Sequence, residues 1–303
     1  PGIANSSGVQ LESGTRKNLA DWLIRPDNAL ALRVMANRLW QWHFGEALAE
    51  SEDFGRLGRS PSHPQLLDWL ARELPRRKWS LKAMHRIILT SMTWRQASRA
   101  DFADKHWQKR LRKDSENRLW SRQNRRRLTG EMVRDTLLTV SGSLSGRQGG
   151  PGIRPPLPKE ITGTLLHNQW KVSESKEDHR RRSIYLFLRR NLRYPMFDLF
   201  DSPPLAASCV RRKTSVTAPQ ALSLLNSEFV NDSANRMAQF AMNQADNANA
   251  QVRLCYERIL GRPPTPEDSQ YAASILNSTS NAEQGLADIC LALFNLNEFL
   301  YMD

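Results

Sequence analysis

Apolar residues recur every three to four positions along most of the chain, which is the spacing of one face of an α-helix. Residues that favour helix ends mark the limits of these stretches, such as Thr15 before the first and Gly45 after the second. Residues 99–127 are rich in Arg and Lys and are predicted to be helical in pieces. The other predicted helices follow Thr15, span 29–44, begin at Pro64 and at Ser80, and span 129–140, 218–243, 248–260, 265–277 and 282–296.

The helix predicted at residues 29–44 is apolar on almost every side. Its polar exceptions Arg33, Asn37 and Gln41 recur every four residues and therefore form one stripe, with Arg38 beside it. Polar groups on a buried helix destabilise the fold unless they find partners, and functional sites often keep such groups. The stripe is therefore a candidate site.

One segment departs from the helical pattern. Residues 183–189 form a short apolar run bounded by arginines, which predicts an extended segment. Residues 141–158 contain several Gly and Pro residues and predict a loop or connection. The predicted fold is therefore mostly α, an irregular multi-helix domain with a short extended or β insert near 183–189 and a C-terminal helical bundle segment.

Changes in composition, and Gly- and Pro-rich segments that interrupt the helical pattern, divide the chain into five stretches. We expect these stretches to pack as one domain. They are a linker at 1–14, a basic helical region at 15–142, a Gly/Pro-rich connection at 143–182, the extended insert at 183–213 and an acidic helical region at 214–303.

The net charge of +13 is unevenly distributed. Residues 1–213 carry 40 basic and 21 acidic side chains, whereas residues 214–303 carry 4 basic and 10 acidic ones. A basic surface could meet an acidic partner such as nucleic acid, an anionic glycan or lipid headgroups. Alternatively, the acidic C-terminal helices could dock onto the basic body and neutralise it within the fold.

Runs of arginine are the most prominent chemical feature, and a guanidinium group matches carboxylate, sulfate or phosphate in shape and charge. The candidate anion-binding residues are Arg125, Arg126, Arg127, Arg181, Arg182, Arg189, Arg190, Arg211 and Arg212. The chain also has nine tryptophans, which stack on sugars or bases as readily as they fill cores. Trp40 and Trp69 fall at the spacing of core positions, which favours a structural role.

The short motifs of common enzyme classes, such as the P-loop and the nucleophile elbow, do not occur in the sequence. No metal site is predicted. His63, Asp53 and Asp68 could form an acid/base or metal cluster if the loop between them folds back. His43 ends a helix, where the dipole favours its charged form, whereas His85 is expected to be solvated. The alternative role for His43 and His63 is to brace helix ends.

Three cysteines are too few for a disulfide scaffold, and their odd number leaves at least one free thiol. Cys255 and Cys290 fall on apolar helix faces and are predicted to be core residues. No apolar run is long enough to predict a membrane-spanning helix.

Several strings together resemble one family. They include Asn28–Gly45 (NALALRVMANRLWQWHFG), Asp53–Gly58 (DFGRLG), Ser62–Leu70 (SHPQLLDWL), Trp79–Arg86 (WSLKAMHR), Glu116–Trp120 (ENRLW), Asn124–Leu128 (NRRRL), Arg182–Phe187 (RSIYLF), Ala218–Leu222 (APQAL) and Asn295–Leu300 (NLNEFL). The chain resembles, over nearly its whole length, the C-terminal domain of unknown function (family 1553) of planctomycete cytochrome c-associated proteins. Four positions depart from the family pattern: Ala29, Trp42, Trp94 and Ser115. Trp42 replaces a usual second histidine, which weakens the idea of a paired-His metal or haem ligand there.

The resemblance implies a piece of an exported multidomain protein, in the periplasm or cell envelope. It implies upstream domains of the same chain, which in this family often include a c-type haem domain. No cofactor is predicted within this stretch. The resemblance also implies that genes for sulfatase-like exported proteins lie nearby, which is consistent with an anionic polysaccharide or a sulfatase-like exported protein as a partner. The family supplies no reaction mechanism.

Three functional hypotheses follow. The first is a module that binds an anionic glycan or partner protein through a basic face, beside a c-type cytochrome domain. The second is a hydrolase-type enzyme acting on polysaccharide, with a site gathered from Arg33, Asn37, Arg38, His43, Asp53, His63 and Asp68. Nucleic-acid binding is the least supported, because no sequence motif for it accompanies the basic runs.

Overall fold

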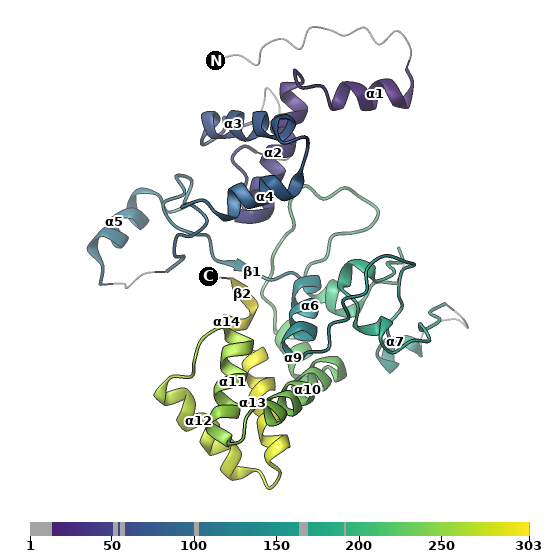
Figure 1. Ribbon diagram of the computed structural model, residues 1–303, viewed down its shortest axis with the longest axis vertical. Coiled ribbons are helices and arrows are strands. Elements are labelled where there is room, and N and C mark those ends of the chain that lie inside the picture. Colours follow the sequence, from purple (N-terminus) through teal and green to yellow (C-terminus); the bar gives the residue numbers. More distant parts are fainter. Residues whose placement is uncertain are drawn as a thin grey trace. The chain divides into compact units, whose positions relative to one another are not determined.

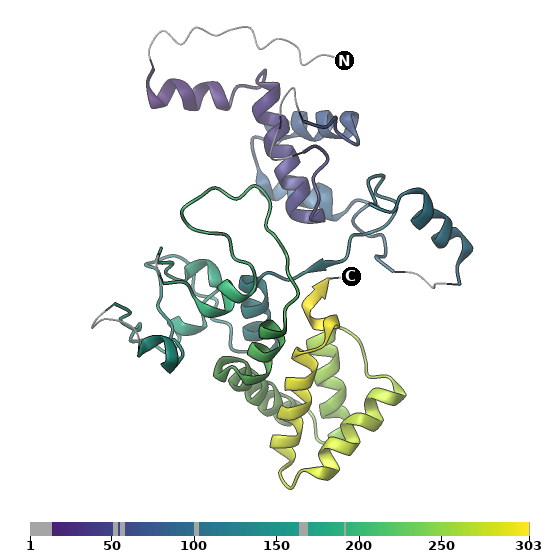
Figure 2. The same cartoon turned by 180° about the vertical axis from the view of Figure 1, so that it is seen from behind.

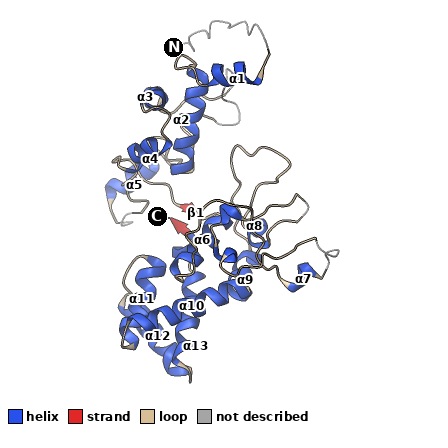
Figure 3. Ribbon diagram, turned by 45° about the vertical axis from the view of Figure 1, so that its right-hand side comes forward, coloured by secondary structure: helices blue, strands red, loops and turns tan. Residues whose placement is uncertain are grey.

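The structure is a computed structural model that describes residues 14–50, 54, 58–99, 103–163, 169–190 and 192–302. These residues are mostly helical, which confirms the predicted fold class (Figures 1 and 3). The strands in the described part are β1 (Arg126–Arg127) and β2 (Tyr301–Met302), which form a two-stranded sheet. None of the described helices is long and apolar enough to cross a membrane.

The chain forms two compact units, one of residues 1–126 with 303 and one of residues 127–302. Each unit has its own hydrophobic core. The predicted basic region at 15–142 therefore contributes to both units, because its last helix belongs to the second.

The described residues of the first unit form five helices. They are α1 (Arg16–Leu23), α2 (Ala29–Phe44), α3 (Pro64–Arg76), α4 (Leu81–Leu89) and α5 (Lys105–Lys113). Two predicted end residues act as expected: Thr15 accepts a hydrogen bond from a backbone N–H group of α1, and Gly45 ends α2 with a φ of 80°. Asn28 likewise accepts a hydrogen bond from a backbone N–H group at the start of α2.

Aromatic rings fill the core of this unit. The rings of Trp40 and Phe44 stack with centroids 4.1 Å apart, and Trp120 packs edge-on against both. The prediction that Trp69 is a core residue is wrong, because its side chain is 44% exposed. The buried face of α3 is formed by Leu67, Leu70, Ala71 and Leu74, and position 69 points away from that face.

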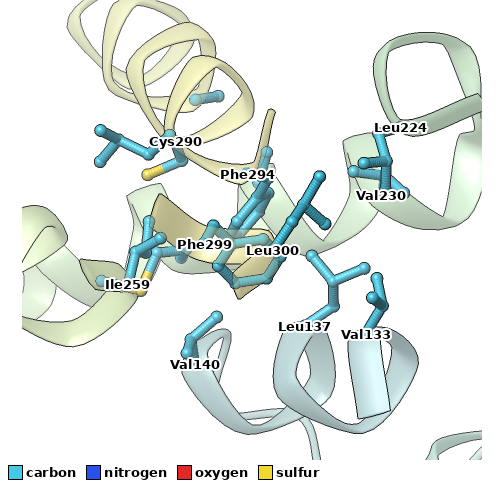
Figure 4. Close-up of a cluster of buried hydrophobic side chains, with 14 of the residues drawn as sticks. Val133, Leu137, Val140, Leu224, Val230, Ile259, Cys290, Phe294, Phe299 and Leu300 are labelled. Carbon is cyan, nitrogen blue, oxygen red and sulfur yellow. The ribbon is translucent and has the colours of Figure 1, made fainter. Parts of the chain in front are cut away.

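The second unit contains the remaining helices (Figure 2). They are α6 (Gly130–Val140), α7 (Lys159–Thr162), α8 (Pro195–Leu199), α9 (Ala218–Asn226), α10 (Glu228–Gln244), α11 (Ala248–Leu260), α12 (Pro266–Ser278), α13 (Ala282–Phe294) and α14 (Asn297–Leu300). Side chains from α6, α13 and α14, including Leu137, Phe294 and Phe299, meet in its core (Figure 4). The single helix predicted at 218–243 is two helices, because Ser227 adopts an extended conformation between α9 and α10.

The predicted extended insert at 183–189 is present as isolated pairings instead of a continuous strand. Ser183–Tyr185 form one turn of 3-10 helix, and Leu186 then makes a parallel bridge with Ile153. The physical reason lies in α6, where Asp135 accepts hydrogen bonds from the backbone N–H and the hydroxyl of Ser183. Side chains thus satisfy polar groups that a neighbouring strand would otherwise pair.

Candidate functional site

The polar stripe of α2 ties that helix to its surroundings. Arg33 Nε lies 2.6 Å from Asp68 Oδ1 on α3, in a half-buried ion pair. The buried Asn37 side chain accepts a hydrogen bond from the Ala49 N–H and donates one to the Ala49 carbonyl, both at 3.0 Å. Arg38 is exposed on the same helix. Arg33 and Asn37 thus have structural partners on α3 and on the loop that follows α2.

The predicted acid/base cluster has two described members. His63 occupies the position before α3, and its Nδ1 atom lies 3.1 Å from Ser62 Oγ. The carboxylate of Asp68 contacts Arg33, and Asp53 lies outside the described residues. The cluster therefore stays a prediction.

The structure brings His43 together with His85, which was expected to be solvated. His43 Nε2, at the end of α2, lies 2.8 Å from His85 Nδ1 on α4. One of these two nitrogens must carry the hydrogen between them. The ring of Trp94 packs edge-on against His43 with centroids 5.6 Å apart. The result is a half-buried imidazole pair beside an indole.

The electrostatics of His43 contradict the expectation from the helix dipole. Burial, followed by the charges of His85 and Arg126, lowers the pKa of His43 from 6.5 to about 4. His43 is therefore neutral near pH 7 and can accept a proton or a hydrogen bond. The expectation that His85 is solvated is also wrong, because it is half-buried against His43.

Arg126 occupies the end of α2 beside this pair. Its Nη1 atom donates to the Trp42 carbonyl at 3.0 Å, and burial lowers its pKa. Carbonyl groups at a helix C-terminus carry partial negative charge, so a guanidinium is stabilised there. Gly45 leaves the room for it, since a Cβ at that position would lie 2.6 Å from Arg126 Cδ.

Several of the predicted anion-binding arginines have partners inside the second unit. Arg181 is 1% exposed, its guanidinium lies 4.0 Å from the centroid of the Tyr185 ring, and it donates to the Gly149 carbonyl. Arg127 donates to Gln220 Oε1 at 2.7 Å and stacks over Phe200. Such residues hold the fold together instead of presenting charge to a ligand.

Two more of these arginines bind groups of their own unit at the surface. Arg212 makes two hydrogen bonds to the carboxylate of Glu131, at 2.7 and 3.0 Å. Burial opposes ionisation of Glu131, but the hydrogen bonds from Arg212 bring its pKa below the usual value. Arg189 donates to the Gln169 carbonyl at 2.7 Å. The hydrogen bonds from Arg212 to Glu131 join the exposed loop before α9 to helix α6.

The remaining predicted arginines point outward: Arg125, Arg182, Arg190 and Arg211 are exposed. Arg190 lines an open cleft of about 470 Å³ in the second unit. Arg193, also in the cleft, forms an ion pair with Asp198 at 2.6 Å. The other lining residues are Ile161, Leu192, Pro195 and Leu199.

A further exposed basic surface lies on α5, outside the predicted anion-binding residues. Only Trp107 of this helix is buried. The helix has no acidic residue, and its basic side chains Lys105, Lys109, Arg110, Arg112 and Lys113 are all exposed. The sequence does contain a sign of this surface, because five of the nine residues of α5 are Lys or Arg and one is Trp107.

No group of three or more His, Cys, Asp or Glu side chains able to hold a metal ion occurs among the described residues. The model of the family PSD1, protein of unknown function (DUF1553), matches residues 15–276 of the chain. No curated protein and no solved structure matches the chain.

Proposed function

Because the chain belongs to the PSD1 family of proteins of unknown function, we propose its function from its own geometry: it is a module that binds an anionic polysaccharide. The observation that carries this proposal is the exposed basic surface of α5. The resemblance described above supports its action at the cell envelope, beside a c-type cytochrome domain.

The charges on α5 repel one another in the unbound protein. Lys109 is four residues from both Lys105 and Lys113 and three from Arg112, so their side chains are neighbours on the helix surface. Like charges at these spacings destabilise a helix by a few tenths of a kcal/mol per pair. A polyanion laid along the helix would remove this repulsion, whereas a neutral ligand would not.

The second unit offers separate basic groups for the same kind of ligand. Residues 204–214 are exposed throughout and include Arg211 and Lys213. Arg190 faces its own cleft. Carboxylate and sulfate groups are the anions of acidic polysaccharides, and both accept paired hydrogen bonds from a guanidinium.

A binding experiment on the full chain tests the proposal. Binding of heparin and of polygalacturonate, measured by calorimetry at low salt, should be detected and should weaken as salt is raised, whereas dextran should not bind. Lys109→Glu/Arg112→Glu should weaken heparin binding at least about tenfold, because it reverses two charges on α5.

Lys171→Glu/Lys176→Glu is the matched control, since it makes the same charge change at exposed positions of the second unit. Equal losses in the two double variants would show an effect of net charge alone and would contradict a role for α5. Tighter binding of single-stranded DNA than of either polysaccharide would favour a nucleic-acid ligand instead.

The second candidate function is hydrolysis of polysaccharide, and the observation in its favour is the His43–His85 contact of 2.8 Å. A neutral His43, with a pKa of about 4, can take a proton from water or a sugar hydroxyl, and His85 can orient it. Release of reducing ends from acidic polysaccharides should then be lost in His43→Gln and in His85→Gln. His106→Gln, at an exposed position on α5, should retain it.

A further inference from the structure

Two of the three cysteines meet in the core of the second unit. Cys255 lies on α11 and Cys290 on α13, and their Sγ atoms are 3.5 Å apart. Both side chains are fully buried. Figure 4 shows Cys290 among the apolar side chains that line this core.

The contact follows from how the two helices pack. α11 and α13 lie side by side, and residues one turn further along each helix, Ile259 and Phe294, belong to the same buried cluster. A disulfide has an S–S distance of about 2.05 Å, so the two sulfurs need to approach by only about 1.5 Å. Small rotations about the side-chain bonds supply a movement of that size.

We propose that Cys255 and Cys290 form a disulfide bond under oxidising conditions. The oxidant is a disulfide of the thiol-exchange class, either a small molecule or a protein. One thiolate attacks a donor sulfur and releases a donor thiol; the second cysteine then attacks the mixed disulfide and releases the other. Two cysteine thiols are oxidised, one donor disulfide is reduced to two thiols, and the two protons of the cysteine thiols end on the donor thiols.

The bond forms before the core closes, because an oxidant cannot reach two sulfurs that are fully buried. In the folded, reduced protein the contact with Cys255, together with burial, raises the pKa of Cys290, so its reactive thiolate is scarce. Cys255 and Cys290 are also consecutive cysteines in the chain, so the disulfide would close a loop that contains no other thiol.

The bond would join α11 to α13 and place α12 inside the closed loop. Closing a loop of this length restricts the unfolded chain and raises stability. Cys209 lies outside the loop, is exposed, and remains as the free thiol.

Thiol counting on the full chain tests the proposal. The protein is unfolded and refolded in a glutathione redox buffer that favours oxidation, then denatured with iodoacetamide and digested for mass spectrometry. We expect alkylation of Cys209 only, with a peptide pair joined through Cys255 and Cys290. Alkylation of all three cysteines, or a link that includes Cys209, would overturn the proposal.

Two variants distinguish the effect of the disulfide on stability from other effects of the redox buffer. Cys209→Ser should still form the link, and its oxidised form should melt higher than its reduced form by on the order of 5–10 °C. Cys209→Ser/Cys255→Ser should melt at the same temperature in both buffers. If oxidised and reduced Cys209→Ser melt at the same temperature, the claim that the cross-link stabilises this fold is overturned.

Discussion

Asn37 binds both backbone polar groups of Ala49 from the middle of an otherwise apolar helix. Its side-chain amide offers one donor and one acceptor, as the backbone of a neighbouring β-strand does, and so holds the loop after α2 in place. The pair is buried, so water cannot replace either bond if the amide is removed.

Asn37→Ala should lower the free energy of unfolding by about 2–4 kcal/mol, because it leaves a buried N–H and a buried carbonyl without partners. Urea denaturation followed by tryptophan fluorescence measures the change. Arg38→Ala, on the exposed side of the same helix, is the control and should stay within about 0.5 kcal/mol of the wild type. Equal effects of the two substitutions would contradict the role of Asn37.

The His43 environment makes stability depend on pH. Its pKa is about 4 in the folded chain, against 6.5 for an unperturbed histidine, so between these values the unfolded chain binds more protons. The contribution of neutral His43 to the free energy of unfolding is therefore fully present above pH 6.5, and it is lost as the pH drops toward 4. Since the side chain is only partly buried, solvent screening limits this loss to about 1–2 kcal/mol.

Urea denaturation of the wild type and of His43→Gln at several pH values from 7 to 4.5 checks this expectation. The variant should lose less stability over that range than the wild type, even if it is less stable at pH 7. His106→Gln should follow the wild type. Parallel curves for His43→Gln and the wild type would count against a depressed pKa.

At the scale of elements, α6 organises an irregular segment that has little secondary structure of its own. The fully buried Arg134 donates to the carbonyls of His179 and Arg181, at 2.6 and 2.8 Å, and contacts Ser183 Oγ. Asp135 binds Ser183 from the next position on the same helix. The helix thus supplies the hydrogen bonds that hold residues 179–183 in place.

Arg134→Leu should destabilise the second unit by about 3 kcal/mol or more, because several buried acceptors lose their donor. Amide hydrogen exchange should become faster at residues 179–189 before it does in α10 or α13. Arg147→Leu is the control: its side chain is 58% exposed and pairs with Asp178 near the same segment. Faster exchange throughout the unit, without a preference for residues 179–189, would argue against this role.

The sequence predicts the helices well, because their ends carry local signals such as Thr15, Asn28 and Gly45. It does not predict the break at Ser227, since one extended residue hardly disturbs the apolar spacing on either side. It also does not reveal the His43–His85 contact, because the two residues are 42 positions apart and neither lies in a motif. Contacts between distant segments are set by packing, which periodicity does not report.

The arginine runs show the same limit. Neighbouring residues in an irregular segment point in different directions, so a run contributes both buried and exposed guanidinium groups. The sequence alone shows that α5 is rich in basic residues. It does not show that these residues are exposed, because that depends on Trp107 being the side chain that packs inward.

At the scale of the whole molecule, several ion pairs join residues of the same part of the chain. The acidic C-terminal region pairs with arginines of its own segment, as Arg262 does with Glu298 and Asp268. Arg212 and Arg33, from the basic part of the chain, pair with carboxylates of that part. These pairs do not require the acidic helices to neutralise the basic body.

The two cores should unfold in separate transitions. Eight of the nine tryptophans precede residue 127, so fluorescence reports mainly on the first unit, whereas circular dichroism reports on helices of both. We expect the two probes to give different midpoints in urea. Trp170→Phe, which removes the tryptophan of the second unit, should leave the fluorescence midpoint unchanged. Coincident midpoints with a single calorimetric peak would show one cooperative domain.

The burial of Arg181 next to the exposed Arg182 has a consequence for how the protein tolerates mutation. A saturation scan should find position 181 intolerant even of lysine, because no other side chain reproduces its ring contact and hydrogen bond in that space. Position 182 should accept most residues. As sequences diverge, such a run can lose much of its positive charge while the fold persists, so the count of arginines in it is a poor guide to what the surface binds.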